Sequence, residues 1–268
     1  MKIIISHDVD HLKIVDHLFK DLFFPKFWIR STTQLLNRKI SFQEWVGRFL
    51  LVFRDRMHNI PELLEFDKRH GIPSMFFFGM ANALGMSYSR KSAKVWIDFI
   101  LNNHLDVGVH GIAYDDYLKM QEEFNDFKIL SGLDSFGIRM HYVRYSSKTF
   151  EYLAKLGYYF DSSEFVEENI RQPYLVNKMW EFPLYAMDSY LLKDGIEGAK
   201  EKICELFDLA EKSGCNYFTF LFHDVYYNTS LFRAYKEFYD WFVFFCIEHE
   251  YEFVSYSTAI NELENERV

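Results

Sequence analysis

Short apolar runs alternate along the chain with longer stretches that carry apolar side chains three and four positions apart. The short runs are typical of buried β-strands and the longer stretches of amphipathic helices. Strands and helices in alternation predict a parallel sheet, and the length of 268 residues favours a closed (β/α) barrel of about 250 residues over an open sheet. We therefore expect one α/β domain over residues 1–268. Its strands are predicted at 2–6, 74–79, 105–110, 136–142, 158–161, 179–182, 217–223 and 251–255.

The stretch 11–58 is too long for an ordinary connection between a strand and a helix. We expect it to form a helical insertion that covers one mouth of the barrel. Within it, residues 18–28 mix Leu, Phe and Trp with Lys and Asp. Two structures fit this segment: a helix packed on the barrel, which we favour, and a peripheral contact with a membrane surface.

Composition narrows the class of protein. Nearly half of the residues are apolar and 19% are aromatic, enough for a substantial core. The net charge of −9 without a basic run argues against nucleic acid as a partner. Cys204, Cys215 and Cys246 are odd in number and lack metal-type spacing, which predicts reduced, buried thiols. Because Met1 leads directly into the first strand and no apolar run is long enough to span a bilayer, we expect a cytoplasmic protein.

Ionisable side chains cluster where the predicted strands end. The carboxyl ends of parallel strands meet at one rim, however distant they are in sequence, so these side chains are expected to converge. The candidates are Asp8 and Asp10 on the first strand, His110 on the third, Arg139, His141 and Tyr142 on the fourth, and His223 and Asp224 on the seventh.

These residue types suit metal-assisted hydrolysis. One carboxylate and two imidazoles hold a divalent ion and leave positions open. Zinc in such a site lowers the pKa of a bound water toward about 7, so a nearby carboxylate can complete its deprotonation. Two Asp residues spaced like Asp8 and Asp10 can divide the work, one as ligand and the other as base. An Arg beside that base would hold it ionised, and a separate His would protonate the leaving group.

The ordered motifs resemble those of the polysaccharide deacetylase superfamily, the NodB-homology proteins of carbohydrate esterase family 4. The resemblance covers nearly the whole chain. Its motifs are Asp8-Val9-Asp10, Val107-Gly108-Val109-His110-Gly111, Arg139-Met140-His141-Tyr142 and Leu221-Phe222-His223. It implies a distorted (β/α) barrel of about seven parallel strands with the helical insertion after strand one. The implied roles are base for Asp8, metal ligands for Asp10 and His110, a base contact for Arg139, an oxyanion donor for the Tyr142 amide, and acid for His223.

One departure from the family pattern concerns the metal. A second His normally follows four residues after the position of His110, but Tyr114 stands there. His141 from the neighbouring strand can replace it, or Asp115 or Asp116 from the same loop. We favour His141, because an Arg-x-His-Tyr segment resembles a variant associated with surface-polysaccharide biosynthesis. A third alternative is a relative that has lost the metal.

The resemblance implies hydrolysis of an N-acetyl group with a divalent metal, zinc first and Co²⁺, Mn²⁺, Ni²⁺ or Fe²⁺ as alternatives. The expected partner is an N-acetylated sugar, either an oligosaccharide or a nucleotide- or lipid-linked precursor of surface polysaccharide, since a cytosolic enzyme cannot reach finished polymer. Two alternatives are a non-sugar amide hydrolase on the same fold and an inactive carbohydrate-binding relative. A non-haem iron oxygenase would use similar ligands, but the alternating strand and helix pattern contradicts it.

Overall fold

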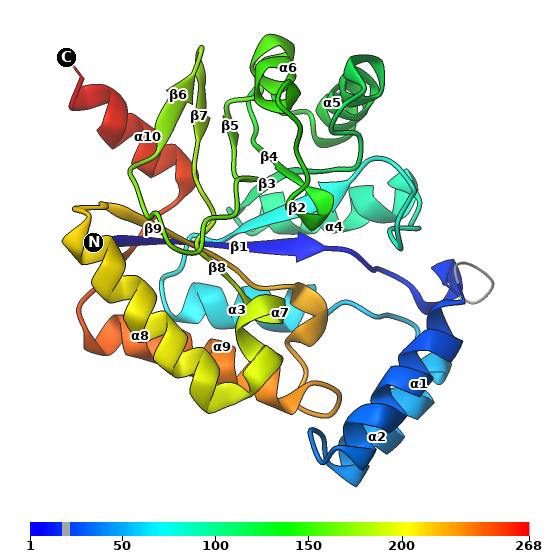
Figure 1. The fold of residues 1–268 in the computed structure, drawn as a ribbon. Helices are drawn as coiled ribbons and strands as arrows, with labels where there is room; N and C mark the ends of the chain where they lie inside the picture. Colours follow the sequence, from blue (N-terminus) through cyan, green and yellow to red (C-terminus); the bar gives the residue numbers. More distant parts are fainter. Residues whose placement is uncertain (18–21, 268) are drawn as a thin grey trace.

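The computed structural model describes residues 1–17 and 22–267 and contains one curled sheet of ten strands (Figure 1). The strand order is β6-β7-β5-β4-β3-β2-β1-β9-β8, and β10 pairs with the start of β1. Every pair is parallel except β6 with β7, which confirms the α/β class and the distorted barrel. The strands are β1 (Lys2–Val9), β2 (Met75–Gly79), β3 (Asp106–Gly111), β4 (Ile138–Met140), β5 (Phe160–Asp161), β6 (Tyr174–Val176), β7 (Met179–Glu181), β8 (Ala186–Met187), β9 (Tyr217–Leu221) and β10 (Glu252–Phe253).

Ten α-helices accompany the sheet within the described residues. Figure 1 shows α3, α8 and α9 together on one side of β1, and α4, α5 and α6 beside β2 to β5. The helices are α1 (Phe23–Leu36), α2 (Phe42–Phe49), α3 (Ile60–Arg69), α4 (Arg90–Asn102), α5 (Tyr117–Ser131), α6 (Thr149–Leu156), α7 (Asp188–Leu191), α8 (Ile196–Lys212), α9 (Arg233–Glu248) and α10 (Tyr256–Asn265).

All eight predicted strand positions contain a strand, with different ends. The prediction for the first strand stopped at residue 6, where the apolar run stops, but β1 continues to Val9. The polar residues in this extension are buried and have partners. The ring of His7 bonds to Asp67 Oδ2 at 2.9 Å and to the carbonyl oxygen of Phe222 at 2.8 Å. A prediction from hydropathy alone therefore places the end of this strand too early. The short strands β6 and β8 were not predicted.

Side chains of β2 alternate between two apolar layers, as the period of a strand requires. Phe76 and Phe78 belong to the core cluster that includes residues of the surrounding helices. Phe77 faces the barrel interior, where it joins Phe160, Phe182 and other rings. Tyr256 of α10 also reaches this interior cluster, so the C-terminal helix closes one end of the barrel.

The insertion contains a hairpin of α1 and α2 that projects from the sheet at the lower right of Figure 1. A small apolar cluster anchors it to the segment before α9: Ile14, Phe24, Leu51, Met57, Leu231 and Phe232. The segment 18–28, for which we expected a helix packed on the barrel, is split. Residues 18–21 lie outside the described part of the chain, and the remainder enters α1.

Two further findings bear on the predictions from composition. No described helix is long and apolar enough to cross a membrane. The three cysteines are free, and Cys215 and Cys246 are buried as expected. Cys204 is exposed, so the prediction of burial was wrong for that thiol. It lies on α8 between the buried Ile203 and Leu206, on the side that faces solvent.

Replacement of Gly137 by Ala should destabilise the barrel by about 1–3 kcal/mol, because a Cβ there would overlap the ring of Phe160. That ring is stacked on Tyr256 at 4.1 Å and has little room to move. Chemical denaturation measures the effect. Gly198→Ala is the matched control: its Cβ meets only Asp194 Cβ at 3.5 Å, and Ala favours a helix by about 0.5–1 kcal/mol. Equal denaturation midpoints for the two variants would contradict this packing.

Candidate metal centre

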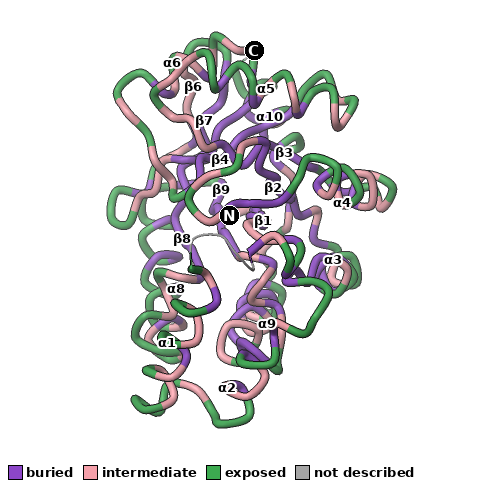
Figure 2. The backbone as a smooth tube through the Cα atoms, turned by 90° about the vertical axis from the view of Figure 1, so that its right-hand side faces the viewer, coloured by how far each residue is buried: buried purple, intermediate pink, exposed green. Residues whose placement is uncertain are grey.

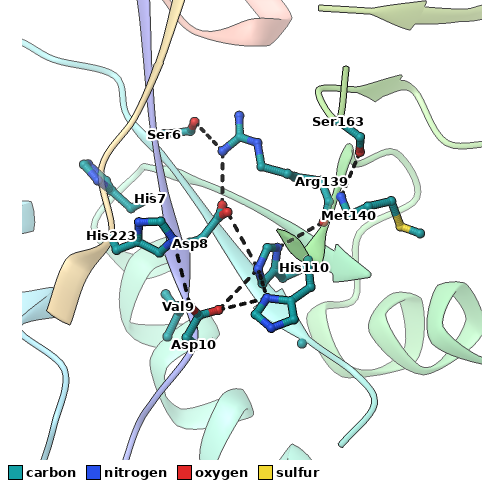
Figure 3. Close-up of polar contacts among 12 residues, drawn as sticks. Ser6, His7, Asp8, Val9, Asp10, His110, Arg139, Met140, Ser163 and His223 are labelled. Carbon is teal, nitrogen blue, oxygen red and sulfur yellow. Dashed lines mark hydrogen bonds and ion pairs between the residues drawn. The ribbon is translucent and has the colours of Figure 1, made fainter. Parts of the chain in front are cut away.

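Asp10, His110 and His141 bring one ligand atom each to within 4.8 Å of one another. Asp10 directly follows β1, His110 lies on β3, and His141 begins the turn after β4. Asp10 Oδ1 lies 3.3 Å from His110 Nε2 and 3.3 Å from His141 Nδ1, and these two nitrogens are 2.9 Å apart (Figure 3). The three strand ends therefore converge on one point, which we call the His–Asp group.

The His–Asp group fits a divalent cation. Asp10 Oδ1 is buried and accepts no hydrogen bond, although both imidazole nitrogens lie 3.3 Å from it. Burial raises the pKa of Asp10, but the imidazoles of His110 and His141 hold it well below its usual range. The other nitrogen of His110, Nδ1, lies 3.0 Å from the carbonyl oxygen of Arg139, which orients Nε2 toward the group. One carboxylate and two oriented imidazoles suit zinc and similar ions.

The alternative ligands from the loop after β3 lie outside this group. Asp116 caps α5, where its Oδ1 accepts a hydrogen bond from the amide of Lys119 at 3.3 Å. Asp115 is exposed. Tyr114, at the position of the expected second His, lies under the Arg144 guanidinium at 4.9 Å. The geometry therefore favours His141 as the third ligand.

Asp8 lies beside the His–Asp group and is held by Arg139. Arg139 is fully buried, and its Nη1 donates to Asp8 Oδ1 at 3.1 Å and to Ser6 Oγ at 2.8 Å. Its remaining donors bond to Ser162 and to the hydroxyl of Tyr256. This network fixes the Asp8 carboxylate, and its Oδ2 lies 3.7 Å from His110 Nε2. Asp8 is thus placed to exchange a proton at the site.

His223 approaches from the opposite side, with Nε2 at 3.9 Å from Asp10 Oδ2. Its Nδ1 lies 2.9 Å from Asp188 Oδ1, and its backbone amide donates to Asp188 Oδ2 at 2.6 Å. Burial lowers the pKa of His223, but the charge and hydrogen bond of Asp188, with Asp10, raise it to about 10. His223 therefore carries a proton at neutral pH.

Asp188 is not among the residues predicted from the sequence, because it follows β8, a strand of two residues. A signal was present. Asp188 comes directly after the apolar run Tyr185-Ala186-Met187, the same pattern that marked the other candidates. Its side chain is fully buried, and both carboxylate oxygens bond to His223.

Tyr142 lies at the mouth of the pocket. Its backbone is left-handed, with φ 58° and ψ 22°, and its side chain is 64% exposed. Its hydroxyl donates to the carbonyl oxygen of Leu84 at 3.2 Å. The oxyanion role of its backbone amide stays a prediction.

Three other ionisable residues lie next to the motifs in the sequence. His7 is fully buried and bonds to Asp67, away from the pocket. Asp224 accepts a hydrogen bond from the amide of Asn59 at 3.1 Å. His11 lines the pocket, and burial lowers its pKa to about 4, so it is neutral at physiological pH.

A cavity of about 390 Å³ contains the His–Asp group, Asp8 and His223. The insertion supplies one wall through Phe23 and Phe27 of α1. Tyr226, Phe232 and Tyr235 add further rings to the lining, and the rings of Phe27 and Phe232 lie 6.3 Å apart. The size is that of a small-molecule site, and the insertion covers it as the sequence predicted.

Asp188→Asn should lower the pKa of His223, because the substitution removes the negative charge that raises it. An NMR titration of the imidazole measures the shift. Asp194→Asn is the matched control, an exposed carboxylate on the same segment that should leave the titration unchanged. An unchanged His223 titration in Asp188→Asn would contradict the pairing.

No protein-family model matches the sequence, and none of the curated proteins is similar to it at a significant level. Solved structures are similar. A protein from Mycobacterium smegmatis assigned as a polysaccharide deacetylase has a TM-score of 0.61 at 15% identity, over 100% of this chain and 91% of that one. A protein from Pseudomonas aeruginosa PAO1, also assigned as a polysaccharide deacetylase, gives 0.59 at 12%, over 96% and 88%.

A third similar structure is that of PuuE allantoinase, with a TM-score of 0.59 at 12% identity, over 96% of this chain and 87% of that one. Structural similarity at identities this low shows the fold alone. The chemistry has to be argued from the residues of the site. The chain therefore has the barrel fold of the polysaccharide deacetylases, as its sequence motifs predicted.

Proposed function

We propose that the protein is a metal-dependent hydrolase that removes an N-acetyl group from a sugar and releases acetate and a free amine. The observation that carries the proposal is the convergence of Asp10, His110 and His141 to within 4.8 Å, with Asp8 and His223 beside them. Amide hydrolysis needs an activated water, a base and an acid, and this arrangement offers a candidate for each.

A divalent ion, when bound, lowers the pKa of a water and polarises a carbonyl oxygen. Asp8, held by Arg139, takes a proton from the attacking water. As the C–N bond breaks, His223 gives its proton to the departing nitrogen, and Asp188 keeps the imidazole oriented and charged for that step. The Tyr142 amide donates to the developing oxyanion. Zinc is the ion we favour, and the same donors also bind Co²⁺, Mn²⁺, Ni²⁺ and Fe²⁺.

In this proposal the substrate is an N-acetylated sugar within an oligosaccharide or a nucleotide- or lipid-linked precursor of surface polysaccharide, and the enzyme acts in the cytoplasm. The size of the cavity and its aromatic lining suit one sugar residue and its linkage. A second candidate is a non-sugar amide hydrolase, which is supported by the fold shared with an allantoinase.

The test is acetate release from a panel of N-acetylated sugars, their nucleotide conjugates and non-sugar amides, with zinc-loaded protein. Release from the sugars supports the proposal, and turnover of only the non-sugar amides supports the second candidate. His110→Ala is the inactive control, and Cys204→Ser, an exposed change on α8, should retain activity. A protein that binds zinc but hydrolyses none of these would contradict both.

A further inference from the structure

The cavity has a basic end formed by the insertion. Arg30 of α1 and Arg48 of α2 line the same cavity as Asp10 and His223. Gln34 lies there too. None of these residues takes part in the proposed proton transfers, so their presence needs another explanation.

Arg48 is a charged group in a nearly dry position, only 4% exposed. Its Nε donates to the carbonyl oxygen of Leu231 at 2.6 Å, its Nη1 donates to Gln34 Oε1 at 2.5 Å, and its guanidinium lies 4.6 Å from the centre of the Phe232 ring. All three partners are neutral. Among the residues that the structure describes, no carboxylate lies within ion-pair distance of Arg48 or Arg30.

A buried guanidinium without an anion is costly, because the loss of hydration is not repaid. The fork of an Arg matches the oxygens of a phosphate, and two Arg on one cavity wall can share a diphosphate. Arg30 is exposed at its end of the cavity, so it can meet an entering anion. The neutral partners of Arg48 fix its position, and Glu44, one turn earlier on α2, offsets its charge only from beyond ion-pair distance.

We propose that this basic end binds the phosphate of a phosphate-linked N-acetylated sugar. The inference rests on the proposed function, since it takes the acetyl group to lie at the His–Asp group. One cavity then holds both ends of the substrate: the acetyl group beside Asp8 and His223, and the phosphate at Arg30 and Arg48. A neutral sugar would leave Arg48 without an ion-pair partner, so the site selects for the charged conjugate.

Binding of inorganic diphosphate and of UDP to metal-free protein tests the inference by calorimetry. Arg30→Gln should weaken binding about 10- to 100-fold, the value of a charge-assisted hydrogen bond. Arg38→Gln is the matched control: it removes an exposed Arg just beyond α1 that does not line the cavity, and it should bind like wild type. No measurable binding by wild type, or equal weakening in both variants, would overturn the inference.

Kinetics separate this inference from the proposed function and identify the source of the phosphate. Arg30→Gln should raise KM for a nucleoside diphosphate N-acetyl sugar or for a polyprenyl diphosphate N-acetyl sugar, and leave KM for the neutral sugar unchanged. The conjugate with the higher kcat/KM identifies the source of the phosphate, a nucleotide or a lipid carrier. Hydrolysis of neutral sugars without preference for phosphate would retain the proposed function and refute the phosphate site. Diphosphate binding without hydrolysis of any sugar would retain the phosphate site and refute the proposed function.

A second surface, the outer face of the α1–α2 hairpin, exposes large apolar side chains, and Figure 2 shows exposed positions alternating with intermediate and buried ones along the hairpin. Leu22, Ile29 and Leu36 are seven residues apart, so they form one stripe along α1. Further exposed side chains follow on and after α2, up to Phe53 at the end of the 3₁₀ helix Leu50–Phe53. The apolar patch consists of Leu22, Ile29, Leu36, Phe42, Phe49, Leu50 and Phe53, with exposed fractions from 44% to 82%.

The hairpin is also basic. Apart from Arg30 and Arg48, which line the cavity, residues 22–56 expose five Lys or Arg and one Asp, a surface charge of +4 in a chain whose net charge is −9. The exposed charges are Lys26, Arg38, Lys39, Arg54, Arg56 and Asp55. Exposed apolar side chains among basic ones are typical of surfaces that lie on anionic membranes. A symmetric contact between two copies through this patch would place +4 against +4, which disfavours a second copy as the occupant.

We infer that the apolar patch and the basic residues around it dock on an anionic membrane surface. Co-sedimentation tests this with vesicles of phosphatidylcholine alone or mixed with phosphatidylglycerol. Wild type should pellet with the mixed vesicles. The double variant Leu36→Ser with Phe53→Ser should lose most of this binding, whereas the control with Leu118→Ser and Ile129→Ser, 68% and 81% exposed on α5, should retain it.

Equal pelleting of the two double variants would overturn the docking surface, and so would an absence of wild-type pelleting with the mixed vesicles. Gel filtration tests the alternative that a second copy of the chain occupies the patch. A wild-type dimer that dissociates only in the variant with Leu36→Ser and Phe53→Ser would assign the patch to a second copy instead.

Discussion

Asp10→Ala should remove divalent metal binding and, with it, hydrolysis. Asp10 is the one carboxylate of the His–Asp group, and its Oδ1 is the buried acceptor without a hydrogen-bond partner. Two imidazoles alone offer the cation no negative charge. Changes to groups that merely orient a ligand cost about 10- to 100-fold in metal affinity, so loss of the ligand itself should cost more than about 100-fold. Zinc titration and acetate release measure the two effects.

The matched control is Asp115→Ala, because Asp115 is the exposed carboxylate of the loop that offered the alternative ligand. It should bind zinc and hydrolyse substrate like wild type. Full metal occupancy and activity in Asp10→Ala would show that the ligand assignment is wrong. Loss of zinc binding in Asp115→Ala would show that Asp115 is a metal ligand.

His223→Ala should lower kcat about 10²- to 10⁴-fold and leave metal binding intact, since loss of a general acid typically has that effect. An amine is a poor leaving group without a proton, and His223 carries one at neutral pH because Asp188 raises its pKa to about 10. Steady-state acetate release gives kcat, and metal analysis confirms that the site is loaded.

A substrate with a good leaving group distinguishes acid catalysis from a general loss of structure. 4-Nitrophenyl acetate expels its phenolate without a proton, so wild type and His223→Ala should hydrolyse it at similar rates. An equal loss on the amide and the ester would contradict the role of His223 as acid. Loss of bound metal in the variant would indicate that His223 is a ligand.

The sequence predicted much of the fold because strands and helices of this chain follow the hydropathy pattern closely. Every predicted strand exists, and the expected rim collects Asp8, Asp10, His110 and His223 from β1, β3 and the end of β9. The rule that parallel strands end at one rim carried this prediction, since it needs only the position of each residue in its strand.

Sequence reasoning failed where long-range partners decide the structure. The end of β1 depends on Asp67 and Phe222, which satisfy the buried His7. Asp188 was missed because β8 has only two residues, and the apolar run of three before Asp188 is too short to predict a strand. Arg48 was not a candidate, because an Arg in an amphipathic helix is ordinarily solvated, and only the packing of α2 against Leu231 buries it.

The central claim is that Asp10, His110 and His141 together bind a divalent ion. X-ray absorption at the zinc edge of the zinc-loaded protein tests it directly. We expect one zinc per chain with two imidazole nitrogens at about 2.0–2.1 Å and a carboxylate oxygen at about 2.0–2.2 Å, and the loss of one imidazole in His141→Ala. A zinc with oxygen ligands and at most one imidazole in the wild type would contradict the claim.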